Sequence, residues 1–189
     1  MSIREAKRAL RRELLRARRA LTLAQREEGA RRVSEHVAAC AELERAERVA
    51  LYAALRDELP TSHLIARALA AGKQLLWPRV NASGSLELAA AAPGELVPDA
   101  AGFLAPPLDR PALSLAPGDV VIVPGVGFTR AGDRLGRGGG HYDRLLSRSP
   151  ATSIGVAFDI QLVLELPTEP HDRGVDLVVT PGGVWRRAQ

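Results

Sequence analysis

Residues 132–144, which read GDRLGRGGGHYDR, combine glycine, arginine and aspartate in a pattern that suits the binding of an anion. The glycines allow several backbone N–H groups to turn toward one point, directly before a predicted helix. Arg134 and Arg137 add planar, permanently charged groups that match phosphate oxygens. Asp143 offers the carboxylate oxygens that Mg²⁺ prefers. A second interpretation stays open, a flexible turn with solvated arginines in which Asp143 only stabilises a helix N-terminus.

Three other sets of polar residues are candidates for binding, and each has a purely structural alternative. Lys7 and Arg11 are four residues apart, so a helix places both cations on one face, where they reach a polyphosphate or remain solvated. Glu58 follows a predicted buried strand and can accept a hydrogen bond from a ligand, or serve only as a loop acid. Residues 169–172 (EPHD) hold two acids and a histidine, which suit a metal ion but are common in solvated loops.

Hydrophobic periodicity predicts the helices that begin the chain. Residues 2–20 carry apolar positions at steps of three and four, which indicates an amphipathic helix. Thr22 and Gln25 form a capping-box pair that starts a second helix. Cys40 falls on the apolar stripe of this second helix, so we expect it to be a small core residue.

After this helical pair, short apolar runs alternate with helical patterns. The alternation predicts an α/β fold with an open, mostly parallel sheet sandwiched between helices. In such sheets, ligands bind beyond the carboxyl ends of the strands, where Glu58 and the glycine-rich loop 125–140 are expected. Residues 91–118 are expected to be connecting and covering structure. The expected strands are 49–55, 74–80, 85–90, 119–124, 153–158 and 177–180, and the expected helices are 61–71, 141–148 and 160–164.

The composition is that of one ordinary globular domain spanning residues 1–189, with 46% hydrophobic and 25% charged residues. The single cysteine excludes an internal disulfide framework and a cysteine-based zinc site. No apolar run is long enough to cross a membrane. The net charge of +4 comes from residues 1–20, which hold eight basic and two acidic residues. We therefore expect a cytoplasmic protein that binds neither nucleic acid nor membranes.

Five strings along the chain resemble those of the 5-formyltetrahydrofolate cyclo-ligases, also called methenyltetrahydrofolate synthetases. They occur in the order of that family and cover nearly the whole chain. The glycine-loop string is highly specific, whereas the first string alone is weak. The strings are KRALR at 7–11, DELPT at 57–61, VPGVGF at 123–128, RLGRGGGHYDR at 134–144, and PHD at 170–172 with Asp176.

The resemblance implies an ATP-dependent closure of 5-formyltetrahydrofolate to 5,10-methenyltetrahydrofolate, with Mg²⁺ and with release of ADP and phosphate. It implies adjoining ATP and folate sites, with Arg134 and Arg137 as catalytic residues. Asp143 and Asp172 would hold Mg²⁺, with Asp176 as the alternative second ligand. The implied ATP-binding residues are Lys7, Arg8, Ala9, Leu10, Arg11, Arg134, Leu135, Gly136, Arg137, Gly138, Gly139, Gly140, His141 and Tyr142. The implied folate-binding residues are Ala53, Glu58, Arg137, Gly138, Gly139, Gly140 and His141, the last of which replaces an aromatic residue.

The expected partners are therefore small molecules, a reduced folate and ATP, with no obligate protein partner. Phosphoryl activation of a formyl oxygen needs positioning and charge neutralisation but no protein nucleophile. A relative that binds folate or nucleotide without turnover is the main alternative. The alternative of a nucleic-acid-binding module is supported only by the basic N-terminus. The chain has just seven aromatic residues with which to stack bases, which argues against this alternative.

Overall fold

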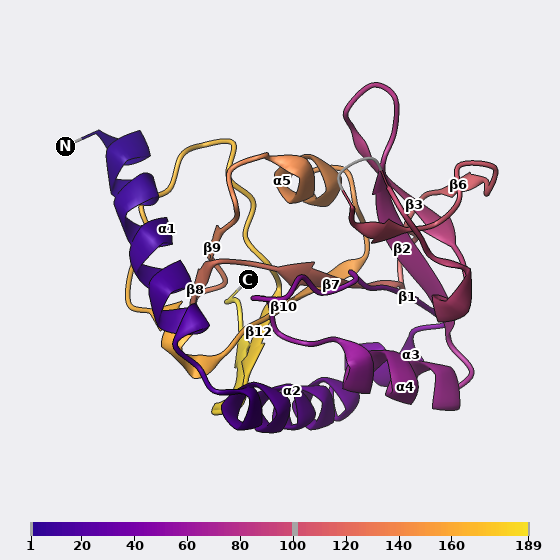
Figure 1. Cartoon of the computed structure of the whole chain (residues 1–189), viewed down its shortest axis with the longest axis horizontal. Helices are drawn as coiled ribbons and strands as arrows, with labels where there is room; N and C mark the ends of the chain where they lie inside the picture. The colour runs from indigo at the N-terminus through magenta and orange to yellow at the C-terminus, as the bar shows by residue number, and fades with distance from the viewer. Residues whose placement is uncertain (1, 100–101, 189) are drawn as a thin grey trace.

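The computed structural model describes residues 2–99 and 102–188, which contain an eight-stranded sheet with helices on both faces (Figure 1). The strands of this sheet are β1 (Arg48–Ala50), β2 (Gln74–Val80), β3 (Leu86–Ala90), β6 (Ala112–Leu113), β7 (Val120–Pro124), β10 (Thr152–Val156), β12 (Leu177–Thr180) and β13 (Gly183–Arg186). Their order is β13-β12-β10-β7-β1-β2-β3-β6. The five strands from β12 to β2 run parallel, and the outer three pair antiparallel. The predicted α/β fold with an open, mostly parallel sheet is confirmed.

The central strands are apolar on both sides because helices cover each face of the sheet. In β7, Val120 and Ile122 enter one core cluster, and Val121 and Val123 enter the other. The first cluster packs against α2 (Leu23–Ala38), α3 (Ala41–Arg45) and α4 (Ser62–Ala70), and the second against α5 (His141–Leu146). Figure 1 shows α5 on one side of the sheet and the other three helices on the opposite side.

The predicted N-terminal helical pair is formed by α1 (Ile3–Arg19) and α2. The capping box that starts α2 is confirmed: the hydroxyl of Thr22 accepts from Gln25 N at 3.2 Å, and Gln25 Oε1 accepts from Thr22 N at 2.9 Å. Cys40 is buried in the core, as expected. In Figure 1, α1 lies to one side of the main sheet, next to a small sheet of β8 (Gly127–Thr129), β9 (Arg134–Leu135) and β11 (Leu162–Val163).

Several predicted boundaries are wrong, each because tertiary pairing overrides the local pattern. The strand expected at 49–55 ends at Ala50, and the apolar residues beyond it form the loop toward Glu58. The helix expected at 160–164 is a 3₁₀ turn, η2 (Asp159–Gln161), followed by β11, which pairs with β8. The loop expected at 125–140 contains β8 and β9, and β13 was not predicted at all.

The segment expected to be connecting structure covers one end of the sheet. It contains the 3₁₀ turn η1 (Pro93–Glu95), the short hairpin of β4 (Val97–Pro98) and β5 (Leu104–Ala105), and the edge strand β6. Within the ranges that the structure describes, no helix has the length and apolar character needed to cross a membrane.

Candidate active site

A cavity of about 670 Å³ opens at the carboxyl ends of β1, β2 and β7. Because these three strands are parallel, the loops that follow them meet at one edge of the sheet. Ala53 and Glu58 come from the loop after β1, and Pro124 comes from the end of β7. Helix α1 and the β4–β5 hairpin complete the wall. The cavity therefore lies where the sequence pattern predicted a ligand.

Most of the predicted site residues line this one cavity. Those that do are Lys7, Arg8, Arg11, Ala53, Glu58, Arg134, Leu135, Gly136, Arg137, Gly138, Gly139, Gly140, His141, Tyr142, Asp143 and Asp172. Three other candidates are not among the lining residues. Ala9 and Leu10 lie on α1 away from the cavity wall, and the Asp176 carboxylate accepts from the backbone and hydroxyl of Ser153 at 2.8 and 2.6 Å.

The glycine-rich loop is built from conformations that favour glycine. Gly138 has φ +105° and Gly140, which precedes α5, has φ +66°, values that are costly for residues with a Cβ atom. Arg11 Nε donates to the carbonyl of Gly136 at 2.7 Å, so α1 holds the loop from outside. The cations of α1 and the glycine loop thus form one continuous wall.

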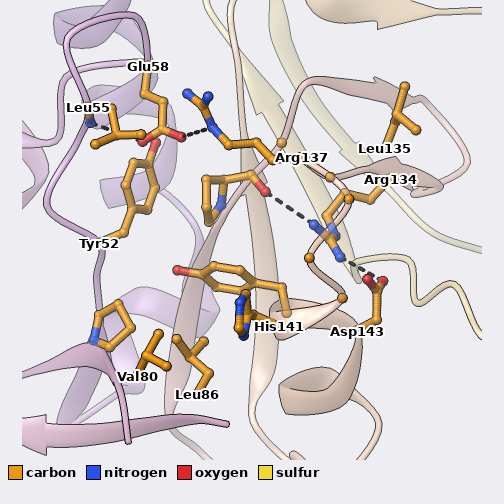
Figure 2. A pocket seen from close by; sticks show the side chains of 18 of the residues that line it. Tyr52, Leu55, Glu58, Val80, Leu86, Arg134, Leu135, Arg137, His141 and Asp143 are labelled. Atoms are coloured by element: carbon orange, nitrogen blue, oxygen red, sulfur yellow. Dashed lines mark hydrogen bonds and ion pairs between the residues drawn. The ribbon is translucent and has the colours of Figure 1, made fainter. Parts of the chain in front are cut away.

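Arg134 is buried at the base of the loop. Its guanidinium donates to Asp143 Oδ1 at 2.7 Å, as Figure 2 shows, and it lies 5.8 Å from the centre of the Tyr142 ring. The Nε atom of Arg134 has no hydrogen-bond partner within the described part of the chain. A buried cation with an unpaired donor beside a glycine loop is well suited to an anionic ligand.

Arg137 reaches across the cavity to the loop that follows β1. Its Nε donates to Glu58 Oε1 at 3.1 Å (Figure 2), and its Nη2 donates to Asp57 Oδ1 at 2.8 Å. The second oxygen of Glu58 accepts from the backbone N–H of Leu55 at 3.0 Å. Glu58 is therefore held at a fixed place where the two loops meet.

Lys7 is almost completely buried, with 5% of its surface exposed. Its ammonium group lies 2.5 Å from Asp172 Oδ2 and 2.7 Å from Glu169 Oε2. Burial disfavours the charge on Lys7, but the hydrogen bonds to Asp172 and Glu169 outweigh it and raise the pKa of Lys7. Lys7 therefore stays cationic in the cavity wall at neutral pH.

The carboxylates in this wall fit a hard divalent cation. The backbone N–H of Arg173 donates to Asp143 Oδ1 at 3.1 Å, which brings the segment carrying Asp172 next to Asp143. Ligand atoms of Glu169, His171 and Asp172 also lie within 4.8 Å of one another. Carboxylate oxygens from two adjoining segments are the donor type that Mg²⁺ takes in phosphate sites.

The opposite half of the cavity is largely apolar. Figure 2 shows Tyr52, Val80 and Leu86 on the side away from Asp143, with His141 between the two halves. Phe103 and Leu104 of the β4–β5 hairpin add to this half. No binding role was predicted from the sequence for these five residues, because their spacing resembles that of ordinary core and loop residues. The two halves suit a ligand with a flat, partly apolar group and a second ligand rich in negative charge.

Comparisons with known proteins find one matching family model and several similar chains. The model of the 5-formyltetrahydrofolate cyclo-ligase family matches residues 3–181. The 5-formyltetrahydrofolate cyclo-ligase of Escherichia coli (strain K12) is 37% identical over 175 residues, covering 89% of this chain and 96% of that protein. The mouse (Mus musculus) 5-formyltetrahydrofolate cyclo-ligase is 29% identical over 194 residues, covering 95% of each chain. The solution structure of 5,10-methenyltetrahydrofolate synthetase from Aquifex aeolicus is similar with a TM-score of 0.85 at 31% identity, covering 97% of this chain and 93% of that one.

Proposed function

The chain belongs to the 5-formyltetrahydrofolate cyclo-ligase family and is an enzyme of that activity, and on this premise we propose that it uses ATP and Mg²⁺ to close the folate ring in the described cavity. One observation carries the proposal. Strings that begin as far apart as residues 7, 57, 134 and 170 all contribute side chains to the same cavity. That cavity has a cationic half and an apolar half, as two such substrates require.

The two halves divide the substrates between them. Lys7, Arg8 and Arg11 of α1, together with the glycine loop, surround the polyphosphate of ATP. Ala53 and Glu58 bind the folate, whose ring system lies against the apolar half. Glu58 suits an N–H group of the pterin because its carboxylate is fixed by Leu55 N and faces the cavity.

The chemistry requires activation of the formyl oxygen, which is a poor leaving group. The formyl oxygen attacks the γ-phosphorus of ATP, so that an O–P bond forms and the bond to ADP breaks. The N10 amine then attacks the formyl carbon, phosphate leaves with the former formyl oxygen, and N10 loses its proton. Both steps depend on positioning and on neutralising charge, and neither needs a protein nucleophile.

Arg134 and Arg137 are the residues that we place at the transferred phosphoryl group. Arg134 is held in place, because it is buried and bonded to Asp143, and it lines the cavity. Arg137 lies at the junction of the two halves, where it already bonds Glu58. Donors fixed in advance at a site of developing charge typically contribute about 10²–10³-fold in rate.

Asp143 and Asp172 would hold Mg²⁺. When bound, the cation neutralises charge on the phosphate oxygens during transfer. Each carboxylate is now paired with a cationic side chain, Asp143 with Arg134 and Asp172 with Lys7. Both cations line the cavity, so phosphate oxygens bound there would lie next to both of them. Asp172 is favoured over Asp176 as the second ligand, because Asp176 is bonded to Ser153 outside the cavity.

The test is formation of the methenyl product, followed by its absorbance. Purified protein is expected to convert 5-formyltetrahydrofolate only when ATP and Mg²⁺ are both present, with one ADP released per product. Product formation at the same rate without nucleotide would contradict phosphoryl activation. Binding of both substrates without any turnover would instead favour the alternative of a non-catalytic relative.

A further inference from the structure

Asp57 lies between two arginines that come from distant parts of the chain. Its Oδ2 accepts from Arg18 Nη2 at 2.8 Å, and its Oδ1 accepts from Arg137 Nη2 at 2.8 Å. Arg18 belongs to α1 and Arg137 to the glycine loop. Asp57 itself does not line the cavity. It therefore connects a catalytic-loop cation to the interior of the molecule.

The interior partner of Asp57 is fixed in place. Arg18 is only 2% exposed, and its Nη1 donates to the carbonyl of Gly125 at 3.3 Å. The Arg26 guanidinium donates to the carbonyl of Arg18 at 2.9 Å, which anchors the backbone of α1 at the same point. A guanidinium at this depth needs a carboxylate partner, since an unpaired buried charge is strongly destabilising. Asp57 is the ion-pair partner of Arg18 in the described structure.

The outer partner of Asp57 has fewer constraints. The Arg137 side chain is 44% exposed and extends from a loop in which glycines follow directly. Its described hydrogen bonds go to Asp57 and Glu58. If Glu58 turns its carboxylate oxygen to the folate, the bond to Asp57 is what keeps the guanidinium in position.

We propose that Asp57, held by the buried Arg18, is a positioning residue that keeps the Arg137 guanidinium at the junction of the ATP and folate halves during ring closure. The inference rests on the proposed function, because it assumes that Arg137 acts on the reacting groups. Burial opposes the charge on Asp57, but Arg18 and Arg137 outweigh it and lower its pKa to about 2. The carboxylate is therefore ionised throughout the neutral range in which the enzyme would be assayed.

A double-mutant cycle on kcat tests the inference. The variants are Asp57→Asn, Arg137→Ala and the double variant, compared with the unaltered enzyme. Asp57→Asn keeps the size and one acceptor oxygen, and misplacement of Arg137 should lower kcat by about 10- to 100-fold. In the Arg137→Ala background, the same substitution should change kcat by less than about twofold, since the group that Asp57 positions is gone.

Arg19→Ala is the matched control for the ion pair. Arg19 is the neighbour of Arg18 on α1 and lies 3.9 Å from the same Asp57 oxygen, but its side chain is 67% exposed. An exposed cation at that distance contributes little to holding a carboxylate. The control is expected to leave kcat unchanged.

One result would overturn the inference alone, and another would overturn the part of the proposed function on which the inference rests. An equal loss of kcat from Asp57→Asn in both backgrounds means that Asp57 acts independently of Arg137, and this overturns the inference. If Arg137→Ala itself keeps full activity, the role given to Arg137 under the proposed function is wrong. Should Asp57→Asn melt below the assay temperature, Arg18→Lys replaces it in the cycle. Lysine keeps a buried cation but cannot bond Gly125 O and Asp57 through two separate guanidinium nitrogens. The loss of kcat from Arg18→Lys is again expected only when Arg137 is present.

Discussion

At the scale of single residues, three carboxylates that line the cavity are each bonded to a cation that also lines it. Asp143 pairs with Arg134, Asp172 with Lys7, and Glu58 with Arg137. A phosphate that recruits Arg134 or Lys7 therefore releases a carboxylate next to itself. Polyphosphate and Mg²⁺ are thus expected to bind cooperatively. The phosphate takes the cationic side chain as its partner, and Mg²⁺ takes the carboxylate that this side chain leaves.

Glu58→Gln is expected to weaken folate binding while leaving ATP affinity nearly unchanged. Glu58 lies after β1, whereas the cations proposed for ATP come from α1 and the glycine loop. The glutamine amide has no charge, and its NH₂ group would face either Leu55 N or Arg137. Because both of these groups are donors, one of the two hydrogen bonds is lost. Calorimetric titration of each substrate measures the two affinities. Glu165→Gln, at an exposed position, is the control, and a selective loss of ATP binding would contradict the assignment.

Asp143→Asn is expected to raise the Mg²⁺ concentration needed for half-maximal rate. Mg²⁺ takes carboxylate ligands in preference to amides, and the asparagine can still accept from Arg173 N and Arg134. The buried Arg134 loses its charged partner, so the melting temperature should fall as well, and the Mg²⁺ dependence is the deciding measurement. A purely structural role predicts a lower melting temperature with the same Mg²⁺ dependence. Rate measurements across a Mg²⁺ series distinguish the two.

Most of the residues predicted from the sequence as site residues line the cavity, and they fall in short contiguous strings. It did not predict the bond between Arg18 and Asp57, which are 39 positions apart and belong to different elements. Nor did it assign a role to Phe103, whose position against the cavity depends on how the β4–β5 hairpin folds over the sheet. Sequence spacing can identify residues that lie together on one helix or loop. Contacts between residues of two different elements can be identified only from the tertiary fold.

At the scale of elements, two of the predicted strands have the predicted bounds, whereas the apolar run 49–55 forms a strand only as far as Ala50. β2 and β12 match their predicted ranges residue for residue, and Gly72 follows α4 with φ +70°. The strands β8, with three residues, and β9, with two, were not predicted, because they form only through pairing. β8 pairs with β9 on one side and with β11 on the other. Strands this short carry no periodicity of their own.

Gly140→Ala is expected to destabilise the protein by about 1–2 kcal/mol through the start of α5. The glycine has φ +66°, and an added Cβ would lie 2.9 Å from Arg144 Nη1. The side chain of Arg144 can move, so the backbone conformation is the main cost. Urea unfolding measures the change in free energy of unfolding. Gly94→Ala is the control, because a Cβ there meets nothing within 4 Å and φ is not positive, and an equal loss at both positions would contradict the argument.

At the scale of the whole molecule, two ion pairs and a hydrogen bond connect the N-terminal helix to the rest of the fold. Arg18 of α1 bonds Asp57 after β1, Lys7 bonds Asp172 before β12, and Arg11 bonds the glycine loop. These contacts join the first helix to segments more than a hundred residues away along the chain, at positions 136 and 172. Acid that protonates the carboxylates should therefore loosen the wall of the cavity as well as the fold.

The pH dependence of stability follows from the lowered pKa of Asp57. Burial opposes its charge, but Arg18 and Arg137 lower the pKa from 3.8 to about 2. The contribution to stability is present above the unfolded value near 4 and is lost as pH falls toward 2, and it amounts to about 2 kcal/mol. Asp172 and Glu169, whose pKa values are lowered by Lys7, act in the same direction.

Urea unfolding at a series of pH values tests this pH dependence. The difference in free energy of unfolding between the unaltered protein and Asp57→Asn should become smaller below pH 4. Asp109→Asn, at an exposed loop position, is the control, and its difference in free energy of unfolding should not change with pH in this way. If the difference for Asp57→Asn stays constant down to about pH 2, this carboxylate is not stabilised by its arginines.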